Sequence, residues 1–210
     1  MAHYFDEQPA VGSDIRSVDV ALPDIAFTME TDRGVFSHGH VDTGTALLLR
    51  EAPTPPASGN LLDLGCGSGV IALTLALRSP DATVWAVDTN ERARSLTAGN
   101  ARRAGADNVR VCAPHEVPAD VEFDTIWSNP PIRIGKAALR ELLSGWLGRL
   151  ADGGTTVLVV QKHLGADSLH RWLDEQGFAT ERRASRAGFR LLESAARVAA
   201  TDERPAHDPT

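Results

Sequence analysis

Cysteines, long apolar runs and a leader-like start are scarce or missing in this sequence. The two cysteines, Cys66 and Cys112, have neither a Cys-x-x-Cys spacing nor nearby histidines, so no zinc site is expected. No apolar stretch approaches the roughly 20 residues that span a bilayer. The first residues lack a basic head followed by an apolar run, so no secretory signal is visible. We therefore expect a cytoplasmic protein with reduced cysteines, no metal and no membrane partner.

Lysine is also rare, and the charges are unevenly distributed. Arginine supplies 19 of the 21 basic residues, there are 28 acidic residues, and the formal net charge is −7. Residues 1–32 hold seven acids and one arginine, whereas residues 33–197 hold 19 basic and 18 acidic residues. This near-neutral central part permits a nucleic-acid substrate without implying one. A length of 210 residues indicates one domain of ordinary size with a small additional segment at most.

The start of the chain differs in pattern from the rest. Two alternating segments, residues 17–22 and 25–30, flank a Pro-Asp turn signal and predict a hairpin. Residues 44–50 have helical character, and the prolines from Pro53 onward end that helix. We expect three parts: a hairpin-and-helix prelude packed on the core (residues 1–56), a main domain (residues 57–197) and a disordered tail (residues 198–210).

In the main domain, short apolar strands alternate with helical patterns, an order typical of an α/β protein with a parallel sheet. An apolar stripe at helical spacing from Leu139 to Leu150 predicts a core-facing helix, and Asp152-Gly153-Gly154 predicts a turn after it. The four tryptophans fall inside predicted elements and are expected in the core. The predicted strands are residues 61–64, 83–87, 109–112, 123–128 and 155–160, with a terminal antiparallel hairpin of 178–183 and 189–195; further helices are expected at 69–78, between Asn90 and Gly105, and around Leu169 up to Gly177.

A glycine-rich loop follows the first strand of the main domain. Gly65, Gly67 and Gly69 form G-x-G-x-G, which departs from the dinucleotide fingerprint G-x-G-x-x-G because Val70 occupies the last glycine position. Asp63 lies two residues before the loop, where a carboxylate repels phosphate but attracts an ammonium group, directly or through water. Asp88, 23 residues after Gly65, ends the second strand, where an acid can accept hydrogen bonds from ribose hydroxyls.

This loop resembles that of class I S-adenosylmethionine-dependent methyltransferases. The resemblance implies a Rossmann-like α/β fold, with a seven-stranded, mostly parallel sheet, a reversed last strand and helices on both faces. It implies S-adenosylmethionine as the cofactor, so residues 57–197 would be the cofactor-binding catalytic domain. The contact to adenine stays unassigned, with backbone groups, apolar contacts or Glu116 as candidates. The residues expected to bind the cofactor are Asp63, Gly65, Cys66, Gly67, Gly69, Asp88 and Thr89.

A second motif, Asn129-Pro130-Pro131, follows the strand predicted at residues 123–128. Open α/β sheets bind ligands at the carboxyl edge of their strands, where this motif is expected. The Asn129 side-chain oxygen and the Pro130 carbonyl can each accept one hydrogen of a planar amino group, and the two prolines make that carbonyl rigid. Such contacts turn the nitrogen lone pair toward a methyl donor. We therefore expect Asn129 to orient the acceptor rather than to act as a base.

Ile132 refines the expected substrate. Relatives that methylate adenine or a glutamine amide have an aromatic residue after Asn-Pro-Pro. The sequence Asn-Pro-Pro-Ile instead resembles the ribosomal RNA guanine-N2 methyltransferases of the methyltransferase small-domain family. Residues 34–45 also resemble the stretch before the cofactor domain in that family. There, Phe36 is a candidate aromatic wall or core residue, and His38 and His40 are expected to be loop residues rather than catalysts.

The resemblance implies an enzyme that methylates the exocyclic N2 amine of a guanine, with ribosomal RNA or a ribosomal subunit as partner. The candidate catalytic residues are Asn129, Pro130, Pro131 and Ile132. Two alternatives stay open: methylation of a protein glutamine amide or a small molecule, and a non-catalytic RNA-binding module with the same fold. Basic residues that either contact RNA phosphates or form a solvated surface are Arg133, Lys136, Arg182, Arg183, Arg186 and Arg190. The sequence does not fix the oligomeric state.

Overall fold

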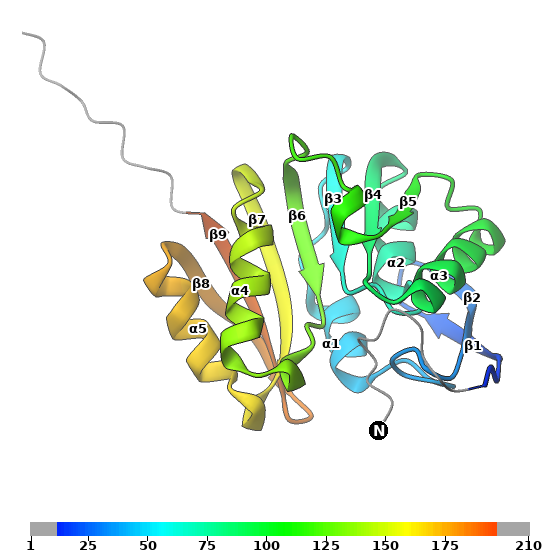
Figure 1. Ribbon diagram of the computed structural model, residues 1–210, viewed down its shortest axis with the longest axis horizontal. Helices are drawn as coiled ribbons and strands as arrows, with labels where there is room; N and C mark the ends of the chain where they lie inside the picture. Colours follow the sequence, from blue (N-terminus) through cyan, green and yellow to red (C-terminus); the bar gives the residue numbers. More distant parts are fainter. Residues whose placement is uncertain (1–11, 197–210) are drawn as a thin grey trace, which may run out of the picture.

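A seven-stranded sheet forms the centre of the computed structural model, which describes residues 12–196 (Figure 1). The strand order is β5-β4-β3-β6-β7-β9-β8, and β9 runs antiparallel to both of its neighbours while the other adjacent pairs are parallel. The predicted fold, with its reversed last strand, is confirmed. The strands are β3 (Ser58–Leu64), β4 (Asp81–Val87), β5 (Val109–Cys112), β6 (Phe123–Ser128), β7 (Leu150–Gln161), β8 (Phe178–Arg186) and β9 (Phe189–Ala196).

Helices cover both faces of this sheet because successive strand residues point to opposite sides. Leu61 and Trp127 pack with α1 (Thr43–Glu51) and α2 (Val70–Arg78) on one face. Leu62 and Ile126 pack on the other face with α4 (Lys136–Leu147) and α5 (Ala166–Glu175), which lie in front of the sheet in Figure 1. All four tryptophans are buried, as predicted. The helix α3 (Glu91–Ala104) begins after its N-cap Asn90 and ends at Gly105, also as predicted.

The predicted N-terminal hairpin is present as β1 (Arg16–Ala21) and β2 (Ala26–Thr31), which pair antiparallel in a separate two-stranded sheet. The buried side chain of Asn100 on α3 connects this hairpin to the main domain. It accepts a hydrogen bond from the Glu30 N–H and donates one to the Glu30 carbonyl, both at 2.8 Å. The helix α1 follows close to the predicted residues 44–50. The division of the chain at residue 56 stays a prediction.

Two details of the sequence prediction around Leu150 are wrong. Leu150 does not continue the α4 stripe but begins β7, where it pairs with Phe123. Asp152-Gly153-Gly154 likewise lies inside β7, because the pairing with β6 shifts between Phe123 and Thr125. The chain accommodates this bulge with glycines: Gly153 has φ +75°, and a Cβ on Gly154 would lie 2.8 Å from the Phe123 carbonyl oxygen.

Two further expectations concern the C-terminal tail and membrane-spanning helices. The tail expected at residues 198–210 lies outside the described residues. Within residues 12–196, no helix is both long and apolar enough to cross a membrane. Three short 3₁₀ turns complete the fold: η1 (Pro114–Glu116), η2 (Ile132–Ile134) and η3 (Lys162–Leu164).

Candidate active site

The two sequence motifs meet because β3 and β6 are neighbours in the sheet. Asp63 of β3 is in register with Trp127 of β6, so the loops that follow the two strands leave the same edge side by side. The buried Ser128 hydroxyl donates a 2.6 Å hydrogen bond to the Leu64 carbonyl and fixes the two strand ends together. The glycine loop and Asn129 therefore start from one rigid point of the sheet.

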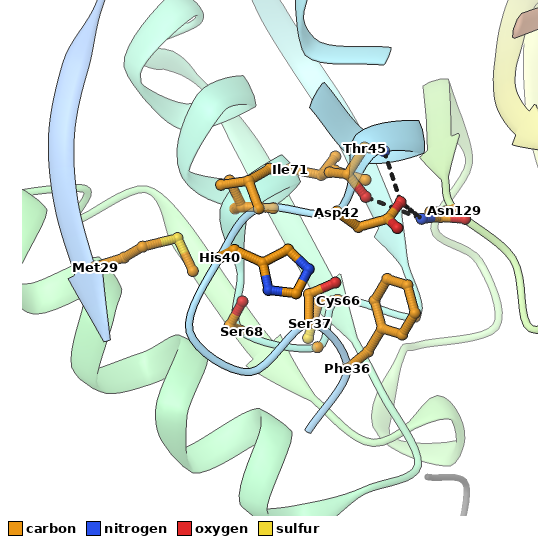
Figure 2. Close-up of a pocket in the computed structure, with 14 residues that line it drawn as sticks. Met29, Phe36, Ser37, His40, Asp42, Thr45, Cys66, Ser68, Ile71 and Asn129 are labelled. Atoms are coloured by element: carbon orange, nitrogen blue, oxygen red, sulfur yellow. Dashed lines mark hydrogen bonds between the residues drawn. The ribbon is translucent and has the colours of Figure 1, made fainter. Parts of the chain in front are cut away.

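A pocket forms where these loops meet the prelude (Figure 2). The close-up shows Asn129 facing Asp42 and Thr45, with the Phe36 ring on the same side of the cavity. Phe36 is 49% exposed, which suits an aromatic wall better than a core residue. The main domain contributes Gly65, Cys66, Gly67, Ser68, Val70, Ile71 and Asn129 to the lining, and the prelude contributes Met29, Phe36, Ser37, His40, Val41, Asp42 and Thr45.

Glycines give the loop its shape and leave room above it. Gly65, Gly67 and Gly69 have φ of +78°, +55° and +89°, values that side chains disfavour. A Cβ on Gly65 would meet no atom within 4 Å, so it would project into open space beside the pocket. Cys66 is buried beside Thr97, and burial raises the pKa of its thiol well above the usual value. The thiol is therefore neutral and contributes to packing.

The helix α3 supports the loop through residues that the sequence reading missed. The Thr97 hydroxyl donates to the Gly67 carbonyl at 3.0 Å, and the Asn100 amide donates to the Ser68 carbonyl at 2.9 Å. Both side chains are completely buried. A signal was present in the sequence, since two polar residues three apart lie on the same face of a helix, here the face toward the core.

Asp88 is bound to the glycine loop. Its Oδ2 accepts a hydrogen bond from the Gly67 N–H and its Oδ1 accepts one from the Asn90 N–H, both at 2.9 Å. The carboxylate is half-buried, and burial raises its pKa despite these hydrogen bonds. Each oxygen retains a further lone pair, so the group can still accept from ribose hydroxyls. The neighbouring Thr89 is exposed, and its carbonyl accepts from the Arg94 guanidinium at 2.7 Å.

Asp63 does not line the pocket. Its carboxylate is completely buried below the loop, where Oδ2 accepts a 2.9 Å hydrogen bond from the Ala72 N–H of α2. Its Oδ1 has no hydrogen-bond partner within the described part of the chain. Burial raises the pKa of this carboxyl group to about 8. The structure therefore shows Asp63 supporting the start of α2, and its attraction for an ammonium group stays a prediction.

The Asn-Pro-Pro segment has a fixed conformation. The Pro130 carbonyl accepts a 2.8 Å hydrogen bond from the Ile132 N–H, in an inverse γ-turn centred on Pro131 with φ −74° and ψ 72°. A carbonyl has two lone pairs, so Pro130 can accept one more hydrogen. Ile132 is half-buried and packs on the core between the sheet, α4 and α5, which fixes the loop from below.

Several other candidate residues have internal partners. Glu116 is exposed, and its carboxylate accepts from the Ala113 N–H at 2.6 Å within its own turn. His38 contacts the Asp14 carbonyl at 2.6 Å, which agrees with its expected role in a loop. In the terminal hairpin, Arg183 pairs with Glu193, Arg186 with Glu51, and the buried Arg190 with Asp167. Three of the four candidate arginines of the hairpin thus already have acidic partners within the described chain.

A different set of basic residues, the rim cations, lies on the segments that follow β6 and β7 at the carboxyl edge of the sheet. Arg133 and Lys136 follow the Asn-Pro-Pro motif, and Lys162 lies on η3 after β7. All three are exposed, and none forms an ion pair with any residue in the described range. The turns η2 and η3 lie close together, since a Cβ on Gly165 would lie 3.8 Å from the Lys136 Cε. They also carry two exposed apolar side chains, Ile134 (37%) and Leu164 (43%).

The fold and the pocket at the carboxyl edge define the class: this is a class I methyltransferase architecture. The methyltransferase small domain family matches residues 26–193, and the chain belongs to this family. The family resemblance seen in the sequence is thereby confirmed. A Bacillus subtilis protein, Uncharacterized protein YbxB, is 36% identical over 176 residues, which cover 82% of this chain and 88% of that protein.

Two relatives have names that describe RNA methylation. Ribosomal RNA small subunit methyltransferase C of Pseudomonas syringae pv. syringae is 32% identical and covers 84% of this chain, with 53% of its own length matched. The structure titled T. Thermophilus 16S rRNA N2 G1207 methyltransferase (RsmC) in complex with AdoMet and Guanosine matches with a TM-score of 0.72 and 25% identity, over 90% of this chain and 52% of that chain. The chain thus spans about half the length of these two methyltransferases.

Proposed function

We propose that the protein is an S-adenosylmethionine-dependent N-methyltransferase that acts on the exocyclic N2 amine of a guanine in ribosomal RNA. The observation that carries this proposal is that the glycine loop and Asn129 line one pocket. A methyl donor on the loop and an amine on Asn129 would then lie within reach of each other. Bringing donor and acceptor together in this way supplies much of the rate enhancement in group transfer.

The residues of the loop fit the proposed cofactor. The open space above Gly65 admits a ligand close to the backbone, and the spare lone pairs of Asp88 suit ribose hydroxyls. No phosphate has to be accommodated, which agrees with the carboxylate of Asp88 at the loop. When bound, S-adenosylmethionine supplies an activated methyl group on a sulfonium. The protein's part is to hold that group in a fixed direction beside the acceptor nitrogen.

Asn129 and Pro130 would hold the acceptor. The Asn129 Oδ1 and the second lone pair of the Pro130 carbonyl accept one hydrogen each from the planar amine. Both acceptors are rigid, because a γ-turn fixes the carbonyl and two hydrogen bonds fix the amide. Holding the two hydrogens turns the nitrogen lone pair toward the methyl group and favours the pyramidal nitrogen of the transition state. The methylated nitrogen is acidic enough to release its proton to water, so no strong base is required.

The rim cations at the carboxyl edge of the sheet support an RNA substrate. Arg133, Lys136 and Lys162 offer charges that no acid of the described chain neutralises, and such charges contact phosphates. The exposed Ile134 and Leu164 beside them offer apolar surface for an unstacked base. The names of the relatives point the same way: a guanosine is bound in the related Thermus structure.

A methyl-transfer assay with three acceptors tests the proposal. We expect tritium from labelled S-adenosylmethionine to appear in ribosomal RNA, supplied as small subunits or naked RNA, and in the N2-methylguanine fraction after digestion. Asn129→Ala should lose at least about 100-fold in rate, the usual effect of removing an orienting contact. If the tritium appeared instead in protein glutamine or in a small molecule, that acceptor would replace RNA as the substrate. If calorimetry showed no binding of S-adenosylmethionine by the native protein, both enzymatic proposals, with RNA or with another acceptor, would be wrong.

The role of the rim cations can be tested separately. Arg133→Gln with Lys162→Gln should weaken RNA binding and lower the salt dependence of log Kd by roughly 0.7 to 0.9 for each lost phosphate contact. The matched control is Arg50→Gln with Arg102→Gln, because these exposed arginines lie in the last turns of α1 and α3, away from the carboxyl edge. Equal effects of the two double variants on RNA binding would show that the rim has no special role.

A further inference from the structure

The side-chain amide of Asn129 is held by two residues of the prelude. Its Nδ2 donates to the Asp42 Oδ2 at 3.0 Å and to the Thr45 Oγ1 at 2.9 Å (Figure 2). These partners come from the start of α1, 84 and 87 positions earlier in the chain. An amide nitrogen has two hydrogens, and both are used here. The amide plane therefore has little freedom to rotate.

The chemistry of Asp42 determines which way the amide faces. An ionised carboxylate only accepts hydrogen bonds, so the nitrogen of Asn129, and not its oxygen, must point toward Asp42. Asp42 itself is fixed, because it is the N-cap of α1 and its Oδ2 also accepts from the N–H groups of Gly44 at 2.8 Å and Thr45 at 3.1 Å. The Asn129 Oδ1 is consequently directed away from the prelude.

We propose that Asp42 and Thr45 are positioning residues for methyl transfer, which orient the Asn129 amide so that its oxygen receives the acceptor amine. This inference rests on the proposed function, in which Asn129 Oδ1 accepts a hydrogen from the substrate. The two hydrogen bonds do more than fix the angle. Donation to a carboxylate shifts electron density toward Oδ1 and makes it a stronger acceptor, since hydrogen bonds in a chain polarise one another.

The proposal gives the prelude a part in the chemistry. The helix α1 is anchored at the same point, since a Cβ on Gly44 would lie 2.7 Å from the Phe189 ring of β9. Its first turn is thus held against the sheet on one side and against Asn129 on the other. A substitution in the prelude can therefore slow methyl transfer without touching the cofactor loop. Without these two partners, Asn129 would retain the contact to substrate, but its amide would lose its fixed direction.

A structural readout that needs no activity comes first. In the amide region of a ¹⁵N-labelled protein, the Asn129 side-chain signals are identified by their loss in Asn129→Ala. We expect both protons to exchange with water at least about ten-fold more slowly than those of an exposed asparagine, because both are hydrogen-bonded. Thr45→Val, which removes one acceptor from a buried site without changing the volume, should remove the protection of one proton. Unprotected Asn129 protons in the native protein would overturn the proposal.

The kinetic test uses a double-mutant cycle. We expect Thr45→Val to lower kcat about ten-fold with the Kd for S-adenosylmethionine within about two-fold, and Thr45→Ser to restore the rate. In an Asn129→Ala background, Thr45→Val should have no further effect, because the amide it orients is gone. An equal loss in both backgrounds would show a merely structural role. Should Thr45→Val not fold, Asp42→Ser serves instead, since serine retains the N-cap but is too short to reach Asn129.

The two tests separate this inference from the proposed function. Protected Asn129 protons together with an absence of methyl transfer to RNA would contradict the proposed substrate while the orientation of the amide stood. Methyl transfer to RNA at full rate in both Thr45→Val and Asp42→Ser would contradict the positioning role while the proposed function stood. A rate loss that occurs only when Asn129 is intact, with thermal unfolding unchanged, would support both.

Discussion

The three loop glycines share left-handed backbone torsions but differ in what surrounds them. A Cβ on Gly65 would meet nothing within 4 Å, whereas a Cβ on Gly69 would lie 2.8 Å from the Thr97 Cγ2 and 3.1 Å from Leu73. The first glycine leaves space for a ligand, and the last lets α3 approach the loop. The same residue type therefore serves two purposes within five positions, and substitutions should separate them.

We predict that Gly69→Ala destabilises the protein by about 3 kcal/mol, because a left-handed torsion and an overpacked contact act together. Gly153→Ala is the matched control: it has φ +75° but no atom within 4 Å of the added Cβ, so only the torsional strain of about 1 kcal/mol applies. Urea unfolding measures both values. Equal losses for the two variants would mean that the contact with Thr97 relaxes at little cost.

Asp63 makes the stability depend on pH. Its pKa is raised by burial to about 8, so the folded protein keeps this proton between about pH 4 and 8 while the unfolded chain releases it. Stability from this group is full below pH 4 and falls as pH rises, by at most about 1.4 kcal/mol per unit. Asp63→Asn, which is neutral throughout, should lack this term and gain on the native protein between pH 5 and 8. Urea unfolding at both pH values checks this; an unchanged difference would contradict it.

At the scale of elements, one asparagine joins three segments. Asn100 of α3 exchanges two hydrogen bonds with the backbone of Glu30 in β2 and donates a third to the Ser68 carbonyl in the glycine loop. The side-chain amide thus pairs with the Glu30 backbone as a residue of a neighbouring strand would. Because it is completely buried, each lost bond leaves an unsatisfied backbone group. Loosening the hairpin should therefore also loosen the cofactor loop.

We predict that Asn100→Ala lowers the free energy of unfolding by about 3 kcal/mol and speeds hydrogen exchange in both β2 and the loop. Arg103→Gln is the control on the same connection, since it removes the exposed Arg103–Glu30 ion pair at 2.7 Å and a 3.2 Å hydrogen bond to the Asn100 Oδ1 but leaves the contacts of Asn100 with the backbone; it should cost less than about 1 kcal/mol. Denaturant titration with hydrogen exchange measures both. Faster exchange in β2 alone, with the loop unaffected, would show that the two segments are independent.

Most elements were predictable because their signals are local. Alternation indicated β1 and β2, Asn90 and Gly105 marked the ends of α3, and the order of strands and helices indicated the parallel sheet. The bulge in β7 was not predictable, since Gly153 and Gly154 favour a turn and a bulge equally. The partners of Asn129 could not be predicted for another reason. The sequence around Asp42 indicates only a helix cap, and its contact with Asn129 joins residues 87 positions apart.

At the scale of the whole molecule, the pocket has walls from two parts of the chain. The prelude supplies Met29 and six residues between Phe36 and Thr45, and the main domain supplies the glycine loop, the start of α2 and Asn129. These walls are joined by hydrogen bonds from Asn129 to Asp42 and from the Asn90 amide to the Gly34 carbonyl. A ligand in the pocket would contact both parts, so its binding energy should stabilise the protein as one unit.

We predict that S-adenosylmethionine at 100 times its Kd stabilises the protein by about 2.7 kcal/mol, which corresponds to a rise in Tm of roughly 5 to 10 °C. Asp88→Ala should show little rise, because it removes the proposed acceptor of the ribose hydroxyls. Hydrogen exchange with bound cofactor should slow in residues 36–45 as well as in residues 65–68, since both segments contribute to the pocket lining. Protection confined to the loop would contradict the joint pocket and leave the prelude without a role in cofactor binding. A similar rise in Tm for Asp88→Ala would instead show that the ribose of the cofactor does not bind at the end of β4.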